Sequence, residues 1–167
     1  MKIGAAQVFN RGRLVVATTA NLSTDTLKLV AVTTAPVGGA ANNAGASIDG
    51  TDASSLYAGL TKATNLPEIT MASAAPNGFG TTFTQTDATD KATLAGPTTA
   101  IDIFTATGAT GAICGFVLYD DTVASPAKPC LVYYPLLTDA DAATTQALST
   151  GDKFTYSPPT GGIWLTI

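Results

Sequence analysis

Residues 111–137, GAICGFVLYDDTVASPAKPCLVYYPLL, decide the fold of this chain. The stretch contains two runs of β-branched and aromatic side chains, residues 113–119 and 130–137, on either side of a polar segment with two prolines. Such runs favour strands, and Asp, Ser and Pro between them favour a turn. No other pair of segments is as dense in large apolar groups. The stretch therefore predicts the central hairpin of an all-β core.

The predicted hairpin keeps the two cysteines apart. If the two runs pair, Tyr119 lies opposite Cys130 and Cys114 lies opposite Pro135. At about 3.3 Å per residue, the Cα atoms of Cys114 and Cys130 are then roughly 16 Å apart. A disulfide requires a separation of about 5.5 Å. We expect two free thiols, with Cys114 buried as a small hydrophobic side chain.

The remaining chain also favours strands, separated by turns. Residues 26–34, TLKLVAVTT, alternate and carry one lysine among apolar groups, so both faces of this strand are expected to be buried. Further strands are expected at 68–72, 79–86, 98–104, 153–156 and 163–167. With roughly seven to nine strands, the fold class predicted is all-β, a β-sandwich or jelly-roll-like single domain with long irregular loops.

At most one short helix is expected, over residues 52–63, where Leu56, Tyr57 and Leu60 have helical spacing. Residues 1–20 are expected to form an N-terminal arm or first strand, and residues 21–167 the β domain. Residues 35–55 are rich in Gly, Asn and Asp and predict a surface loop. A loop of this length is usually functional.

The composition excludes several classes of function. Charged residues make up 12% of the chain, against roughly 25% in an average protein, while Ala and Thr number 29 each. The net charge is −4, so a phosphate-binding face for nucleic acid is not expected. No apolar run is long enough for a membrane helix. The N-terminus lacks the apolar core of a secretory signal, which suggests synthesis in a cytoplasm.

Few residues suit catalysis or metal binding. The chain has no histidine and a single glutamate, Glu68. The best carboxylate pairs, Asp120/Asp121 and Asp139/Asp141, are expected to be solvated turn residues, so no cofactor, metal or enzymatic activity is predicted. Among the tyrosines that could stack on sugars, Tyr133 and Tyr134 are expected to divide between a core face and a surface face.

Four segments resemble, in the same order, a family of small structural proteins of tailed-bacteriophage virions. The first is residues 8–34, in which Asn10, Arg11 and a Leu-x-Thr-Asp-Thr-Leu-Lys-Leu run (residues 22–29) match the opening of the family's domain. The others are PEITMASAAPNGFG (67–80), GAICGFVLYDD (111–121) and GDKFTYSPPTGGIWLTI (151–167). The chain departs from the family in residues 35–55 and in Phe79, where tyrosine is commoner.

The resemblance implies a structural component of a phage particle. We expect a capsid decoration (cement) protein that bridges neighbouring major capsid subunits on the virion surface and forms a homo-oligomer, a trimer being favoured. The alternative is a tail- or fibre-associated protein, with or without a glycan-binding surface. Partner contacts are expected on the N-terminal arm and the 35–55 loop, at Arg11, Arg13, Val37, Asn42, Asn43 and Ile48.

Overall fold

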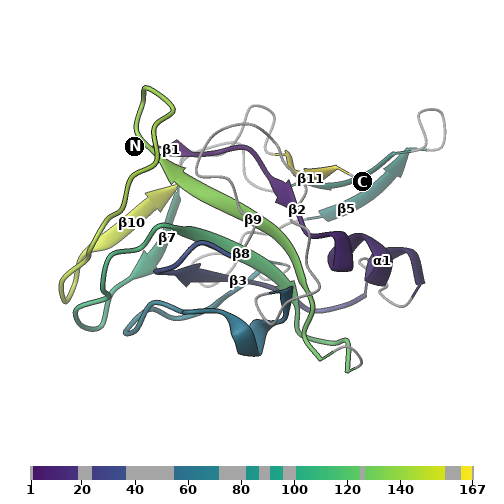
Figure 1. The fold of residues 1–167 in the computed structure, drawn as a ribbon, viewed down its shortest axis with the longest axis horizontal. Coiled ribbons are helices and arrows are strands. Elements are labelled where there is room, and N and C mark those ends of the chain that lie inside the picture. Colours follow the sequence, from purple (N-terminus) through teal and green to yellow (C-terminus); the bar gives the residue numbers. More distant parts are fainter. Residues whose placement is uncertain are drawn as a thin grey trace.

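In the computed structural model, residues 130–137 form β9 (Cys130–Leu137), the longest of the described strands, as the sequence predicts (Figure 1). The structure describes residues 2–18, 24–36, 55–71, 82–86, 91–95, 101–124, 127–156 and 163–166. The other elements in these ranges are β1 (Lys2–Ile3), β2 (Gln7–Val8), α1 (Asn10–Thr18), β3 (Leu27–Val32), the 3-10 helix η2 (Tyr57–Gly59), β4 (Ile69–Thr70), β5 (Thr82–Thr86), β6 (Lys91–Ala95), β7 (Ile101–Thr105), β8 (Gly115–Asp120), β10 (Lys153–Tyr156) and β11 (Ile163–Thr166).

The central sheet is antiparallel and has the order β1-β9-β8-β3-β4, with β2 also paired to β9. Tyr119 lies opposite Cys130, which confirms the predicted register at the turn end of the hairpin. An irregularity between Leu118 and Tyr119 then shifts the pairing, so that Gly115 and not Cys114 faces Pro135. Both cysteines are free, as expected. Cys130 is the fully buried one, whereas Cys114 is only half-buried, contrary to the prediction.

Both faces of the central sheet are buried. Alternate residues of the strands belong to two separate apolar clusters, with Phe116 and Tyr134 in the first and Val117 and Tyr133 in the second. The expectation that Tyr133 and Tyr134 divide between core and surface is therefore wrong, because each side of β9 is covered by another part of the chain. β3 is likewise almost fully buried, which confirms the reading of residues 26–34.

The two faces of the sheet are covered by different segments. On the first face, a two-stranded sheet of β7 and β10 brings Phe104 and Phe154 against Phe116, with ring centroids 5.5 and 5.0 Å apart. On the second face lie Phe9, which directly precedes α1, and Leu60, which follows η2. A third sheet has the order β11-β6-β5. The domain is thus mostly antiparallel β-structure with one short α-helix, which confirms the all-β fold class.

The α-helix is not where the sequence placed it. Residues 10–18, expected to belong to an extended arm or strand, form α1 after the two short strands β1 and β2. Gly12, which breaks the apolar pattern, is needed here because α1 lies directly on β9. A Cβ atom at residue 12 would lie 2.8 Å from the carbonyl oxygen of Cys130 and 2.8 Å from Cα of Leu131. Glycine allows this close approach of two backbones.

The helix predicted over residues 52–63 is also corrected, for the part that is described. Tyr57–Gly59 form a 3-10 helix and no α-helix is present over residues 55–63, and the flanking Leu56 and Leu60 have extended backbones. Leu56 forms a bridge with Pro129, and Lys62 forms one with Val32. The apolar side chains of this segment therefore reach the second face of the sheet from a strand-like chain that pairs with its neighbours. None of the helices in the described ranges could cross a lipid bilayer.

Candidate functional site

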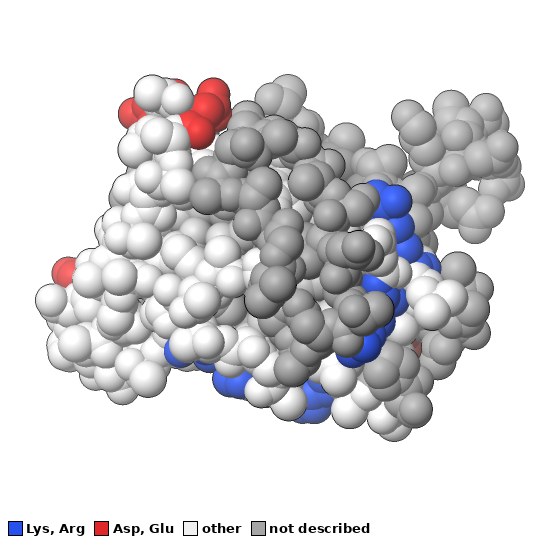
Figure 2. Space-filling model, viewed as in Figure 1, with Lys and Arg blue, Asp and Glu red and all other residues white. Residues whose placement is uncertain are grey.

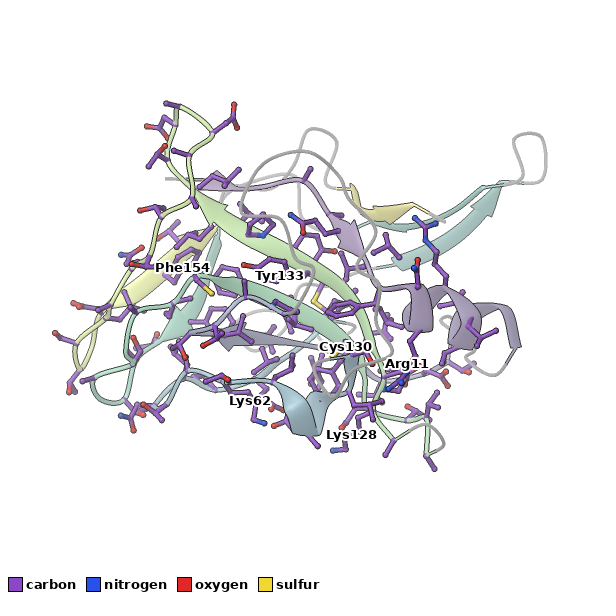
Figure 3. All side chains as sticks on the ribbon, viewed as in Figure 1. Arg11, Lys62, Lys128, Cys130, Tyr133 and Phe154 are labelled. Carbon is purple, nitrogen blue, oxygen red and sulfur yellow. The ribbon has the colours of Figure 1, made fainter. Side chains whose placement is uncertain are left out.

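Two of the six predicted contact residues lie in the described part of the chain. Val37, Asn42, Asn43 and Ile48 lie outside the described residues. Arg11 and Arg13 are on α1, where Arg11 is half-buried and Arg13 is exposed. Arg11 is labelled near Cys130 in Figure 3, at the end where β9 begins, and Lys62 and Lys128 both approach the ring of Tyr57. The surroundings of Tyr57 contain the hydrogen bonds of Glu68 and the ion pairs of Asp121.

Glu68 is the centre of that network. Its Oε1 accepts a hydrogen bond from the hydroxyl of Tyr57, and its Oε2 accepts one of 2.7 Å from the hydroxyl of Tyr119. The two tyrosine rings lie 4.6 Å apart between centroids. Burial, followed by the hydrogen bond to Glu68, raises the pKa of Tyr57 to about 12 and raises that of Tyr119 further. Both hydroxyls therefore remain protonated donors at neutral pH.

Two lysines approach the ring of Tyr57. The Nζ atom of Lys62 lies 4.1 Å from the ring centroid and donates a hydrogen bond of 3.3 Å to the backbone carbonyl of Tyr57. The Nζ atom of Lys128 lies 5.4 Å from the same centroid. Contacts of this kind stabilise by about 0.5–1 kcal/mol at exposed sites. Since the ring already contacts Tyr119 and Lys62, it is a poor platform on which to stack a sugar.

Asp121 forms ion pairs with two lysine side chains. Its carboxylate forms ion pairs of 2.6 Å with Lys28 on β3 and 2.6 Å with Lys128 in the hairpin turn. Hydrogen bonds from these lysines, that from Lys128 being the larger influence, hold the pKa of Asp121 below its usual value. Asp121 therefore ties the turn before β9 to the beginning of β3. It is not the free turn carboxylate that a catalyst would need.

Asp120 is fully buried and shapes the start of the same turn. Its Oδ1 accepts hydrogen bonds of 2.8 and 3.2 Å from the backbone N–H groups of Thr122 and Val123. Burial is the main cause that raises the pKa of Asp120, and a hydrogen bond with Asp25 raises it further. Through these two amide contacts, Asp120 holds the backbone of the turn that follows it.

A separate hollow of about 420 Å³ lies near the other end of β9. Its lining includes Cys114, Tyr133, Thr144 and Thr145. The hydroxyl of Tyr133 donates a hydrogen bond of 3.2 Å to the carbonyl of Cys114. Burial raises the pKa of the Cys114 thiol, so this thiol is a weak nucleophile at neutral pH. The volume falls within the range of roughly 300–1,000 Å³ that is common for small-ligand sites.

The two aspartate pairs considered from the sequence are not brought together. Asp120 ends β8 and Asp121 follows it in the turn before β9, whereas Asp139 and Asp141 are exposed in the loop after β9. Within the described ranges, no three or more acidic or cysteine side chains gather in a group that could hold a metal ion. The neighbourhood of Glu68 was not anticipated from the sequence, because its members come from separate segments with no common spacing.

On the face shown in Figure 2, blue basic atoms follow the lower edge and right side of the molecule, and most of the visible red acidic atoms lie at the upper left, where β9 ends in Figure 1. We call the first region the basic edge; its members are Arg11, Arg13, Lys62 and Lys128. We call the second the acidic tip; its members are Asp139 and Asp141. No protein-family model, curated protein or solved structure matches this chain significantly.

Proposed function

We propose that this chain is a non-enzymatic structural subunit of a tailed-phage virion, and that it decorates the capsid. One observation carries the proposal: the buried and half-buried carboxyl groups are engaged with the fold itself. Glu68 binds two tyrosines, Asp121 binds two lysines, and Asp120 binds Asp25 and two backbone amides. Such groups rigidify a domain, whereas a catalytic carboxylate must face a substrate.

The composition and the resemblance in the sequence support the same function. A surface poor in charge and rich in Thr and Ala suits a protein that is packed against neighbours in many copies. The segments that resemble phage virion proteins include β3 and β8, two strands of the central sheet. Bridging of neighbouring capsid subunits requires interfaces of roughly 1,600 Å² or more. Binding only to the assembled shell would stabilise that shell by mass action.

The proposal is tested on purified particles of a phage that encodes this chain. Densitometry of the virion proteins measures the copy number, and an electron cryo-microscopy map locates the chain. Hundreds of copies on the head surface are expected for a decoration protein. A particle without the chain, or an enzymatic activity that Glu68→Gln abolishes without unfolding, would overturn the proposal. Particles assembled without the chain are expected to lose their DNA at a lower temperature than complete ones.

A second candidate is a tail- or fibre-associated protein that binds host glycan. The hollow beside Cys114 favours it, because its lining combines apolar residues with Tyr133, Thr144 and Thr145. A copy number of about six to thirty per virion, together with binding to host polysaccharide, would select this candidate. Binding that Thr145→Trp abolishes would place the sugar in the hollow. Tyr57 is less suited, since its ring contacts Tyr119 and Lys62.

A further inference from the structure

The hollow near the end of β9 has a buried floor and an open side. Tyr133 and Leu136 on β9 are almost completely buried, whereas Ala143 and Thr145 in the loop after β9 are exposed. A molecule that enters between them contacts the central sheet on one side and keeps water on the other. The volume of about 420 Å³ leaves room for a small organic molecule.

The polar groups at the floor of the hollow are already paired within the fold. The carbonyl of Cys114 accepts hydrogen bonds of 2.8 Å from the N–H of Leu136 and 3.2 Å from the hydroxyl of Tyr133. The N–H of Cys114 donates a hydrogen bond of 2.9 Å to the carbonyl of Val32, and its thiol donates one of 3.5 Å to the same oxygen. Within the described residues, no buried side-chain atom that lacks a hydrogen bond lines the hollow. The floor therefore offers few hydrogen bonds to a ligand.

The described lining also carries no charge at neutral pH. Half of its residues are apolar, namely Ala35, Pro135, Leu136 and Ala143, and neither the basic edge nor the acidic tip contributes to it. A charged ligand would lose its contact with water here and gain no ionic partner, which is unfavourable. A sugar would have the same difficulty in pairing its many hydroxyls at the floor.

We propose that the hollow binds an uncharged small molecule that is apolar over most of its surface. Removal of this apolar surface from water provides the binding free energy. Thr144 and Thr145, beside the open side, are placed to orient a polar group of the ligand. The inference does not rest on a place in the virion, and it differs from the glycan candidate in the class of ligand that the hollow takes.

Isothermal titration calorimetry of the full chain with 2-naphthol tests the proposal, because this probe is an uncharged aromatic molecule with one hydroxyl. We expect saturable binding of one molecule per chain. Ala143→Trp, which fills the open side of the hollow, is expected to weaken binding about tenfold or more. Ala140→Trp changes another exposed alanine of the same loop, outside the lining, and is the matched control that should bind as the wild type does.

Alkylation of Cys114 by iodoacetamide gives a second measurement that is local to the hollow. At the concentration of 2-naphthol that gives half occupancy in calorimetry, the rate of alkylation in the native protein should be halved, as measured by mass spectrometry. Naphthalene-2-sulfonate has the same rings and one negative charge. It is expected to protect Cys114 about tenfold less effectively, because the lining offers no partner for the charge.

Each outcome supports or overturns the inference. The absence of protection by 2-naphthol up to its solubility limit overturns it, as does equal protection by the sulfonate. Binding that Ala143→Trp leaves unchanged would show an adventitious additive only. If methyl glucoside protects Cys114 and 2-naphthol does not, the hollow takes a sugar and the inference is wrong. Ala143→Leu replaces the tryptophan variant if that variant does not fold. None of these results depends on whether virions contain the chain, so the virion proposal is judged separately.

Discussion

The hydroxyl of Tyr119 donates a hydrogen bond of 2.7 Å to Oε2 of Glu68, and it thereby anchors the segment before β4 to the turn end of the hairpin. Tyr119 is fully buried on β8, while Glu68 is only half-buried. The only glutamate of the chain therefore acts as an acceptor for a core residue. Because Tyr119 is buried, substitutions of Glu68 are expected to change the stability of the domain.

Replacement of Glu68 by alanine is expected to destabilise the domain. The change leaves the buried hydroxyl of Tyr119 without its acceptor, which costs about 1–3 kcal/mol of unfolding free energy. Glu68→Gln keeps one acceptor oxygen and is expected to cost less. Urea denaturation followed by tyrosine and tryptophan fluorescence measures both, with the exposed Thr61→Ala as control. Equal stability of the Glu68→Ala and Thr61→Ala variants would show that the hydrogen bonds of Glu68 with Tyr57 and Tyr119 do not stabilise the fold.

Gly12→Ala is expected to destabilise the protein although alanine is the better helix former. Helix propensity alone favours alanine by about 1 kcal/mol. The added Cβ would meet the backbone of Cys130 and Leu131 at 2.8 Å, and neither backbone can move without disturbing β9. We expect a net loss of about 1–3 kcal/mol, as for other overpacked sites. Leu14→Ala, at a side chain that is 62% exposed on the same helix, is expected to be nearly neutral. A stabilised Gly12→Ala variant would mean that α1 does not contact β9.

Stability is expected to fall as pH rises through the folded pKa of Asp120. Burial raises this pKa above its value in the unfolded chain, so the folded state binds the proton more tightly. The contribution of Asp120 to the free energy of unfolding is fully present below its unfolded pKa, about 3.9. This contribution is lost as the carboxyl group ionises in the folded protein. Asp120→Asn keeps the Oδ1 acceptor for Thr122 and Val123 but cannot ionise, so its stability should vary less with pH above this value.

Thermal unfolding at several pH values from 4 to 8 measures this difference, with the exposed Asp139→Asn as control. Asp121 acts in the opposite sense, because its lysine partners lower its pKa and its contribution is lost only as pH falls through that lowered value. Identical pH profiles for the wild type and Asp120→Asn would show that folding does not raise the pKa of Asp120.

The two thiols are expected to react in a fixed order. Burial raises the pKa of Cys130 to about 12, and Cys130 is fully enclosed, so it should react with a disulfide reagent such as DTNB only when the domain unfolds. Cys114 is half-buried and lines the hollow, so it should react first, although more slowly than free cysteine. Mass spectrometry of the labelled native protein assigns the site, and Cys114→Ser should abolish the native-state reaction. Faster labelling of Cys130 would contradict the described packing of β9.

The sequence predicted the strands well and the surface poorly, for physical reasons. Residues 130–137 form a strand with the expected bounds, because continuous apolar runs mark strands that are buried on both sides. α1 was missed because Gly12 resembles a break in the pattern, and only its contact with β9 explains the glycine. The contacts of Glu68 were also missed, since Tyr57 and Tyr119 are brought to it by tertiary pairing.

The glycine at position 115 has a consequence for how the hairpin finds its pairing. In a sheet with one wet face, a slip of one residue is prevented because it would expose the core. Here both faces are apolar, so that penalty is largely absent for β8 and β9. A Cβ atom at residue 115 would lie 2.5 Å from Cε2 of Tyr133, so the tyrosine ring fits only over a glycine. If β8 slipped by one residue, the side chain of Cys114 or Phe116 would collide with the ring of Tyr133. We therefore expect the fit of Tyr133 over Gly115 to select the native register of the hairpin during folding.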